Sequence, residues 1–396
     1  MDEGPPAPPT APPRAEAPAF PSGPGTTRGA APSADAARSR VFPCEQCGAD
    51  VTFDVASQRL KCPYCSHEKD LSDAARRTVS EQDFEKRLAW LADRRGRDRP
   101  IRAEDVHEVR CGSCGANVVF QGTLTSTHCP FCGIPVQREK VHDLTATDRI
   151  PVDGILPFQV PAARAQEILR KWVTSRWFAP GEFKKRGVDA RFQGVYVPYW
   201  TFDAMTQNRY TGLRGEHYWV TVGSGKNQRR VRKTRWWPAA GAFQLFFDDV
   251  LVVAAKGLPD DLLVKLEPWP LAKCLPFNAE LMSGFLARTY DVELPEGFRA
   301  AKVRMDDGIR TETRRRIGGD EQQITTLESV YDAVTYKHVL LPVWLLSYRW
   351  KEKTHRVCVN AVTGELQGTR PWSVWKIVFL VLGVAAAVAA AFAVAK

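Results

Sequence analysis

Two cysteine quartets with identical spacing constrain this chain more than any other feature of its sequence. In each quartet one CxxC pair is followed, after 14 intervening residues, by a second CxxC pair. The quartets are Cys44, Cys47, Cys62 and Cys65, and Cys111, Cys114, Cys129 and Cys132. Flanking residues recur in register, so that Gly48, Ala49, Val51, Phe53 and Pro63 match Gly115, Ala116, Val118, Phe120 and Pro130. The chain therefore contains a duplicated module.

The spacing of each quartet suits a tetrahedral zinc ion. Two cysteines separated by two residues can turn both thiolates onto one ion, and two such turns complete an S4 set. Disulfides would require an oxidising compartment, and a redox CxxC would require a βαβ setting. His67 and His128 flank the pairs, but four thiolates already close each site. We predict two structural zinc ions, with no open coordination position for a substrate.

Each module has the features of a small β zinc ribbon. Gly48 follows the first CxxC pair, where a positive φ is often required. Val51 and Phe53 alternate, which puts apolar side chains on one face of a strand. A module of roughly 25 residues buries too little surface to fold alone, so the ion would supply much of its folding free energy. The predicted ribbons cover residues 41–69 and 109–140.

The first 40 residues differ in composition from the rest of the chain. They contain 10 Pro and 10 Ala, with four acidic residues and four arginines. Such a segment buries too little apolar surface to order itself, and we predict a disordered tail over residues 1–40. The formal net charge of +10 then belongs to residues 41–396. A basic surplus favours anionic partners, either nucleic acid or an anionic membrane.

An uncharged apolar segment lies close to the C-terminus. Residues 377–395, IVFLVLGVAAAVAAAFAVA, hold no charged or polar side chain, and as a helix they would extend roughly 28 Å. Trp372 and Trp375 stand where an interfacial aromatic belt would lie, and Arg370 and Lys376 lie just outside the segment. A buried Ala-rich helix is the alternative. We predict a transmembrane helix that anchors the protein by its tail to the cytoplasmic membrane, with its bulk in the cytoplasm.

The segment between the two modules predicts a helical connector over residues 70–108. Residues 80–83, Ser-Glu-Gln-Asp, resemble a capping box, and Phe84, Leu88 and Leu91 then recur at helical spacing. We expect this apolar stripe to pack on a neighbouring element.

The region 150–372 has the pattern of an α+β domain with antiparallel hairpins. GVYVPYWTFDA at 194–204 and VLLPVWLLSYRW at 339–350 predict strands, and a long helix is expected from about 295 to 316. Both strands carry Pro-x-Trp. Because proline cannot donate to a β-ladder, this pattern predicts strand edges, bulges or strand starts.

Short repeats within that region indicate a weak internal duplication. LPF occurs at 156–158 and again at 275–277, in addition to the two Pro-x-Trp strands. The predicted fold class for the whole chain is α+β. It consists of two small β zinc ribbons joined by a helix, an α+β domain with antiparallel hairpins, and one C-terminal transmembrane helix at 377–395.

Catalytic motifs are lacking in the sequence. VGSGKNQ at 222–228 superficially resembles a phosphate loop, but Val220 and Asn227 stand where a Walker A sequence requires Gly and Ser or Thr. A glycine turn in a hairpin is the better interpretation. HExxH, GxSxG and GxGxxG are also lacking. Nothing in the sequence therefore argues for an enzyme or for a small-molecule substrate.

A basic run follows this predicted turn. It consists of Lys226, Arg229, Arg230, Arg232, Lys233 and Arg235, and Trp236 and Trp237 come directly after it. Cations beside aromatic rings suit phosphate contact with base stacking, and they equally suit an anionic bilayer surface. A solvated strand face is the third interpretation.

Several motifs together resemble a known group of proteins. They are YKHVLLPVWLLSYRWKEKTHRVCVNAVTGELQGTRPWSVWKI at 336–377, ILPFQV, YVPYWTFD, DDVLVVAAKGLP and LMSGFLARTYDVEL, together with the cysteine modules. With these the chain resembles bacterial TFIIB-type zinc-ribbon membrane proteins, some of which are labelled primosomal replication factor Y or superfamily II helicases. The resemblance covers about residues 41–380. It implies zinc at the eight cysteines and a membrane-proximal location, but no established activity.

These observations lead to one preferred function and two alternatives. The preferred one is a non-enzymatic, tail-anchored adaptor whose zinc ribbons bind an unknown protein partner. The first alternative is a nucleic-acid-binding zinc-ribbon factor without a helicase motor, since ribbons and a basic surplus permit this use. The second is an enzyme with an unrecognised site in the 150–372 domain, which would require a pocket with convergent polar groups.

Overall fold

The computed structural model describes most of the chain after residue 38. The described residues are 39–40, 42–49, 51–71, 78–93, 106–110, 117–121, 124–128, 135–138, 150–177, 180, 192–225, 228–256, 258–290, 292–350, 353–370 and 373–394. The chain divides into two units, 1–36 and 37–396, and every described residue belongs to the second. The predicted disordered tail lies outside the described residues, except for 39–40.

Strands dominate the described residues. The strands are β1 (Ser39–Arg40), β2 (Thr52–Asp54), β3 (Arg59–Lys61), β4 (Glu68–Lys69), β5 (Gln82–Asp83), β6 (Val106–Arg110), β7 (Asn117–Gln121), β8 (Leu124–His128), β9 (Pro135–Arg138), β10 (Gly154–Ile155), β11 (Gln193–Val222), β12 (Arg229–Val253), β13 (Leu275–Pro276), β14 (Leu286–Arg288), β15 (Glu321–Trp350), β16 (Lys353–Asn360) and β17 (Leu366–Gly368). The helices are α1 (Phe84–Asp93), α2 (Ala162–Thr174), α4 (Asp260–Leu263), α5 (Leu294–Ile317) and α6 (Val374–Val394), with short 3-10 turns η3 (Val264–Leu266), η4 (Leu271–Lys273) and η5 (Ala279–Met282).

The predicted α+β class is wrong, because the fold is mostly β, with 44% strand against 28% helix. The difference arises from three very long strands. β11 and β15 each contain 30 residues and β12 contains 25. The sequence pattern indicated strands where hydrophobic residues cluster and a hairpin turn at 222–228, but it did not show that β11, β12 and β15 each continue as one strand over 25 to 30 residues.

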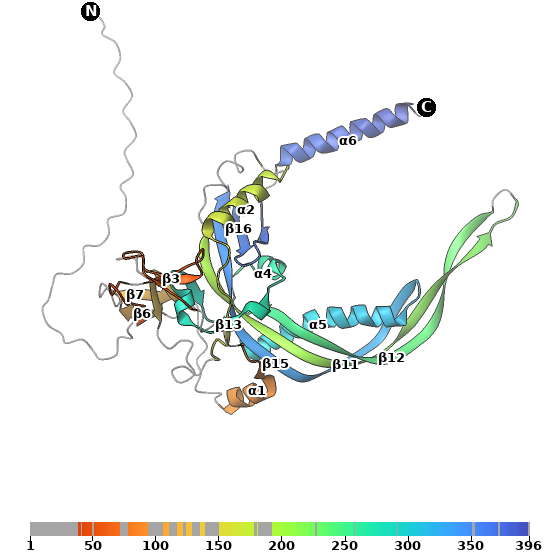
Figure 1. Ribbon diagram of the computed structural model, residues 1–396. Helices are drawn as coiled ribbons and strands as arrows, with labels where there is room; N and C mark the ends of the chain where they lie inside the picture. Colours follow the sequence, from red (N-terminus) through yellow and green to blue (C-terminus); the bar gives the residue numbers. More distant parts are fainter. Residues whose placement is uncertain are drawn as a thin grey trace, which may run out of the picture. The chain divides into compact units, whose positions relative to one another are not determined.

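The main sheet is built around β11, which pairs antiparallel with β12 on one side and with β15 on the other (Figure 1). Its strand order is β1-β9-β8-β14-β11-β15-β10-β13, with β12 added to β11, β5 and β16 added to β15, and β17 added to β16. The first cysteine module forms a separate sheet in the order β2-β3-β4, and β6 pairs with β7.

Both Pro-x-Trp motifs lie in central strands rather than at sheet edges. Pro198 of β11 stands between the end of pairing with β14, at Tyr196, and the start of pairing with β12, at Tyr199. Pro342 of β15 stands likewise between pairing with β10 and pairing with β16. On one side of its strand, each proline therefore lies where pairing with one neighbouring strand has ended and pairing with the next has not begun. No backbone N–H is required from the proline on that side.

The repeated motifs pair with one another. Leu275 of the second LPF lies opposite Ile155, the residue that precedes the first LPF. The two Pro-x-Trp strands are direct partners, because Tyr196 lies opposite Pro342 and Pro198 lies opposite Leu340. The internal duplication stays a prediction. The strands that carry its repeated motifs are neighbours in one sheet.

Residues 195–204 of β11, which we call the proximal segment, form the centre of the core. Every residue of the segment is buried, so both of its faces are covered, which explains its near-continuous apolar sequence. Trp200 and Phe202 pack toward α5, together with Phe84 of α1. Tyr199 packs on the opposite face, where its ring lies 6.2 Å from that of Trp269.

Two predicted helices are confirmed, with one change in capping. α5 begins and ends within about two residues of the predicted helix. α1 buries Phe84 and packs Leu88 and Leu91 against the core, as the apolar stripe predicted. Its cap is Asp83 rather than Ser80, because Asp83 Oδ1 accepts a 2.9 Å hydrogen bond from the Lys86 amide.

The prediction of a transmembrane helix at 377–395 is wrong. In the part of the chain that the structure describes, no helix is both long and apolar enough to cross a bilayer. Three further predictions depended on this helix and are wrong with it. They are the tail anchor, the membrane as a partner and the location at the cytoplasmic membrane.

Candidate metal centre and neighbouring sites

The first cysteine quartet forms a compact cluster of sulfurs. The four Sγ atoms of Cys44, Cys47, Cys62 and Cys65 lie within 4.8 Å of one another. The Cys44–Cys65 and Cys47–Cys62 sulfur pairs are each 3.5 Å apart. Four thiolates about 2.3 Å from one zinc ion would lie roughly 3.8 Å from each other. The cluster therefore has the size of a tetrahedral S4 site, and His67 is not part of it.

The two CxxC turns of this cluster have matching backbone geometry. The Gly48 amide donates to the Cys44 carbonyl at 2.9 Å, and the Ser66 amide donates to the Cys62 carbonyl at 3.0 Å. Gly48 has φ +74° and Ser66 has φ 61°. The positive φ predicted at Gly48 is confirmed, and the second turn adopts the same conformation with a serine.

Backbone N–H groups around the turn favour the thiolate form of Cys62. The largest influence is the Cys65 amide and a further one is the Tyr64 amide, and together they lower the pKa of the Cys62 thiol to about 7, although burial opposes them. Hydrogen bonds to sulfur stabilise the charged form that binds metal. The turn therefore stabilises the thiolate of Cys62, whereas the pKa of Cys65 is raised to about 12, because the hydrogen bond from the His67 amide, which lowers it, is outweighed by burial and the neighbouring thiols.

The ribbon is joined to the main sheet through a shared core. Cys44, Val51, Phe53, Leu60 and Cys62 belong to the same apolar cluster as core residues of α2 and β15. Two backbone contacts support this packing. Ser283 Oγ donates to the Val51 carbonyl at 2.8 Å, and the Phe53 amide donates to the Ser283 carbonyl at 3.2 Å. One face of the ribbon is thus internal to the protein.

The second quartet cannot be compared in the same way. Cys111, Cys114, Cys129 and Cys132 lie outside the described residues. The strands around them are described, and β8 and β9 pair with each other and join the main sheet through β14.

The basic run lies on β12, next to the turn that joins it to β11. Arg229, Arg230, Arg232, Lys233 and Arg235 are on the strand, and Lys226 lies outside the described residues. The predicted glycine turn is confirmed by Gly223 and Gly225, which have φ 102° and 59°. The phosphate-loop resemblance therefore belongs to a hairpin turn.

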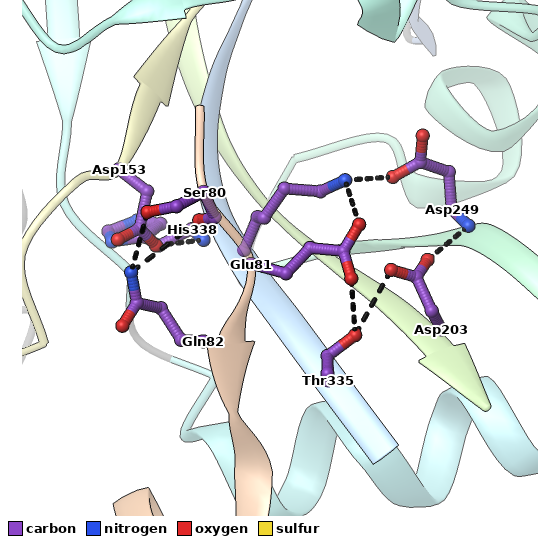
Figure 2. A network of polar contacts seen from close by, with 9 residues as sticks. Ser80, Glu81, Gln82, Asp153, Asp203, Asp249, Thr335 and His338 are labelled. Carbon is purple, nitrogen blue, oxygen red and sulfur yellow. Dashed lines mark hydrogen bonds and ion pairs between the residues drawn. The ribbon is translucent and has the colours of Figure 1, made fainter. Parts of the chain in front are cut away.

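A polar network that the sequence did not predict lies on the sheet near β5 (Figure 2). Thr335 Oγ1 lies 2.8 Å from Glu81 Oε2 and 3.1 Å from Asp203 Oδ2. Lys337 Nζ lies 2.8 Å from Asp249 Oδ1 and 3.4 Å from Glu81 Oε1. These residues are far apart in the chain, so no local motif could have indicated them.

One carboxyl group of the network takes up a proton at a higher pH than its residue type suggests. Burial, and after it the nearby Glu81, raises the pKa of Asp203 to about 6, against the Asp249 amide, which lowers it. A hydroxyl carries a single hydrogen, so Thr335 can bond both carboxyl groups only when one of them is protonated. Asp203 is the group whose raised pKa favours this proton.

A cavity of about 600 Å³ adjoins the network. Its walls include Thr201, Asp249, Cys274, Leu275 and Lys337. The Thr201 hydroxyl is fully buried and has no hydrogen-bond partner among the described residues. This is the kind of pocket that an enzymatic site in the 150–372 domain would require.

The walls of the cavity offer no activated nucleophile among the described residues. Burial raises the pKa of the Cys274 thiol to about 12, so it stays protonated at neutral pH. Burial alone would lower the pKa of Lys337, but its bond to Asp249 and the surrounding carboxylates raise it. Lys337 therefore stays an ammonium ion, and the network ties residues 81–83 to the sheet.

Comparisons with known proteins give one similar protein of similar length. The chain is 24% identical over 347 residues to the uncharacterized protein YdjG of Bacillus subtilis (strain 168), which covers 87% of this chain and 94% of the relative. No protein-family model matches the chain. No solved structure gives a significant match.

Proposed function

We propose that the chain is a non-enzymatic zinc-binding adaptor whose ribbons bind a protein partner. One zinc ion would be held by Cys44, Cys47, Cys62 and Cys65, and a second by Cys111, Cys114, Cys129 and Cys132. The observation that carries the proposal is the closed cluster of four sulfurs within 4.8 Å. A closed S4 set leaves no coordination position for a substrate, so its zinc would be structural.

The partner-binding part of the proposal rests on the exposed side of the first ribbon. Cys47 and Cys65 are exposed, while Cys44 and Cys62 are buried against the core. Tyr64, between the second pair of cysteines, is 75% exposed. A tyrosine held rigidly by a metal-bound turn is a suitable anchor for a protein interface, because little conformational entropy is lost when it is buried.

The resemblance to TFIIB-type zinc-ribbon proteins also belongs to this proposal. It is supported by the motifs quoted above and by the geometry of the first quartet. The adaptor function is preferred over an enzyme because neither Cys274 nor Lys337 in the cavity is activated.

Zinc stoichiometry tests the metal sites. Full-length protein purified without chelator should contain two zinc ions per chain by elemental analysis. Cys62→Ser and Cys129→Ser should each lower this value to one, because three ligands hold the ion much less tightly. Cys274→Ser is the matched control, since Cys274 lies outside both quartets, and it should retain two. Zinc-free wild-type protein would contradict the proposal.

Site-specific crosslinking tests the partner surface. A photoreactive amino acid at position 64 should give a crosslinked protein adduct in cells. The control is the same substitution at Trp177, which is 76% exposed but lies outside the ribbon. Equal labelling at positions 64 and 177 would show that exposure alone explains the adduct.

A further inference from the structure

The ends of β11 and β12 form a two-stranded arm to which no third strand is paired among the residues that the structure describes. Pairing between β11 and β15 ends at Gly215, opposite Glu321. Pairing between β11 and β12 continues from Glu216 opposite Arg235 to Val222 opposite Arg229. We call residues 216–222 and 229–235 the distal arm, and Figure 1 shows it continuing past the end of β15. Seven residue pairs extend about 24 Å at 3.4 Å per residue.

The arm carries five cations, none of which forms an ion pair with a carboxylate among the described residues, although Glu321, which is bonded to His217 and Thr234, acts on Arg232 at longer range. Its five cations, Arg229, Arg230, Arg232, Lys233 and Arg235, are accompanied by a single acidic residue, Glu216. Glu216 pairs with Arg214 at 3.0 Å, at the base of the arm. Across the described residues, none of the five arm cations lies within ion-pair distance of a carboxylate.

Helix α5 shows that this lack of pairing is not general. Arg310 pairs with Asp306 at 2.6 Å, and Arg315 and Arg316 both pair with Glu312 at 2.7 Å. These three arginines are paired within the helix, whereas those of the arm remain available to an external anion. The charge of the arm therefore complements a polyanion.

Aromatic rings are interleaved with these cations and face solvent. Trp219 is 57% exposed and Trp237, at the base of the arm, is 49% exposed. The guanidinium of Arg230 lies over the Trp219 ring at 5.8 Å, and that of Arg235 lies over the Tyr218 ring at 5.1 Å. Such stacking uses the face of the guanidinium and leaves its in-plane N–H donors available to phosphates.

The turn at the end of the arm argues against insertion into a bilayer. Its described residues, Gly223, Ser224, Gly225 and Gln228, carry no apolar side chain. A hairpin that enters a membrane would place apolar residues at this point. Exposed rings beside unpaired cations instead match the surfaces that bind unpaired bases and their phosphates.

We propose that the distal arm binds single-stranded nucleic acid. Arg230, Arg232 and Arg235 contact phosphates, and Trp219 and Trp237 stack on bases. Binding of this kind depends little on base sequence and strongly on salt. The arm is remote in sequence from the cysteine quartets, so this activity goes beyond the proposed zinc-dependent function and does not depend on it.

Fluorescence anisotropy with a labelled oligothymidylate of about 15 nucleotides tests this proposal on the full-length protein. The wild-type affinity should fall steeply between about 50 mM and 200 mM salt. The triple variant Arg230→Gln, Arg232→Gln, Arg235→Gln should bind at least about tenfold more weakly at the lower salt. The slope of log affinity against log salt should decrease by about 2, since each single-strand phosphate contact contributes about 0.7.

Two controls separate the arm from general charge and general exposure. The triple variant Arg310→Gln, Arg315→Gln, Arg316→Gln removes the same charge from α5 and should bind like the wild type. The double variant Trp219→Ala, Trp237→Ala should bind about tenfold more weakly or worse, and Trp177→Ala should not. Circular dichroism and zinc content, expected to be unchanged in all four variants, distinguish loss of binding from loss of the fold or of the ribbon.

Three results would overturn the proposal. The first is a wild-type protein that does not bind the oligonucleotide at low salt. The second is equal binding by the two triple variants. The third is tighter binding either to a duplex of the same length or to phosphatidylglycerol vesicles, because each would assign the arm to a different partner.

Discussion

The proximal segment and the first half of the distal arm, residues 216–222, belong to the same strand, β11, but differ in their surroundings. Trp200 in the proximal segment is completely buried, whereas Trp219 is 57% exposed. β11 lies between β12 and β15 at Trp200 and pairs with β12 alone at Trp219. The number of neighbouring strands and covering helices, rather than residue type, therefore decides whether an aromatic side chain stabilises the fold or is available for binding.

Trp200→Ala should have the largest effect on stability. The ring is fully buried, lies 4.9 Å from the Tyr290 ring and donates a 2.9 Å hydrogen bond to the Val292 carbonyl. Truncating such a side chain leaves a cavity and costs about 3–5 kcal/mol. Urea denaturation followed by circular dichroism measures the loss. A loss below about 1 kcal/mol would mean that the proximal segment is not the centre of the core.

The pH dependence of stability should reveal the buried carboxyl group of Asp153. Burial is the largest influence and raises its pKa from 3.8 to about 6, although the His338 amide lowers it. Between about pH 4 and pH 6 the folded chain then binds more protons than the unfolded chain, so this contribution to stability falls as pH rises. Asp153→Asn keeps an acceptor for the amide and should gain about 2 kcal/mol relative to the wild type from pH 4 to pH 7.

Glu321, at the base of the arm, serves as a control for that experiment because its pKa is shifted in the opposite direction. A hydrogen bond from His217, at 2.7 Å, is the largest influence on Glu321 and lowers its pKa. A lowered pKa gives stability that is lost as pH falls, so Glu321→Gln should not reproduce the gain of Asp153→Asn. Unfolding curves of wild type and Asp153→Asn that stay parallel from pH 4 to pH 7 would contradict the assignment of Asp153.

Two glycines of α5 should respond differently to alanine. A Cβ at Gly297 would lie 2.7 Å from Trp200 Cδ1, and the buried indole has no room to move. A Cβ at Gly308 would meet only the Phe247 ring, at 3.0 Å, and that ring is half-exposed. Gly297→Ala should lose about 1–2 kcal/mol despite the better helix propensity of alanine, and Gly308→Ala should be close to neutral. Equal effects in thermal denaturation would contradict the close packing of α5 on Trp200.

Trp219→Ala should have the smallest effect on stability. The ring is more than half exposed and contacts Arg230 rather than the core. We expect a change within about 0.5 kcal/mol by the same urea denaturation used for Trp200→Ala. A loss comparable to that of Trp200→Ala would show that the arm is part of the folding core and would remove the contrast between the two regions.

Local patterns in the sequence predicted the parts whose chemistry is local. The spacing of Cys44, Cys47, Cys62 and Cys65 predicted a ligand cluster that the structure confirms, because a CxxC turn sets its own geometry. The same holds for α5, whose helical pattern extends over several turns, and for the glycine turn at 223–225. Whether two zinc ions bind stays a prediction, since the second quartet lies outside the described residues.

Predictions that depended on surroundings were less successful. The α+β class was wrong because β11, β12 and β15 continue as strands well beyond their apolar centres. The membrane span at 377–395 was wrong: it was inferred from the apolar run and its flanking aromatic and basic residues, and no described helix is both long and apolar enough to cross a bilayer. The network of Glu81, Asp203, Asp249 and Lys337 was missed because its members come from separate elements.

By itself the sequence determined the spacing of the cysteine ligands, the glycine turn and the run of cations next to aromatic residues, because these features depend on residues close together in the chain. Only the tertiary structure decided which tryptophans are buried, where the ribbon packs and which arginines lack a carboxylate partner. Burial and pairing arise from contacts between distant residues, such as Glu81 with Thr335, or from the end of a neighbouring strand at Glu321. No local pattern contains that information.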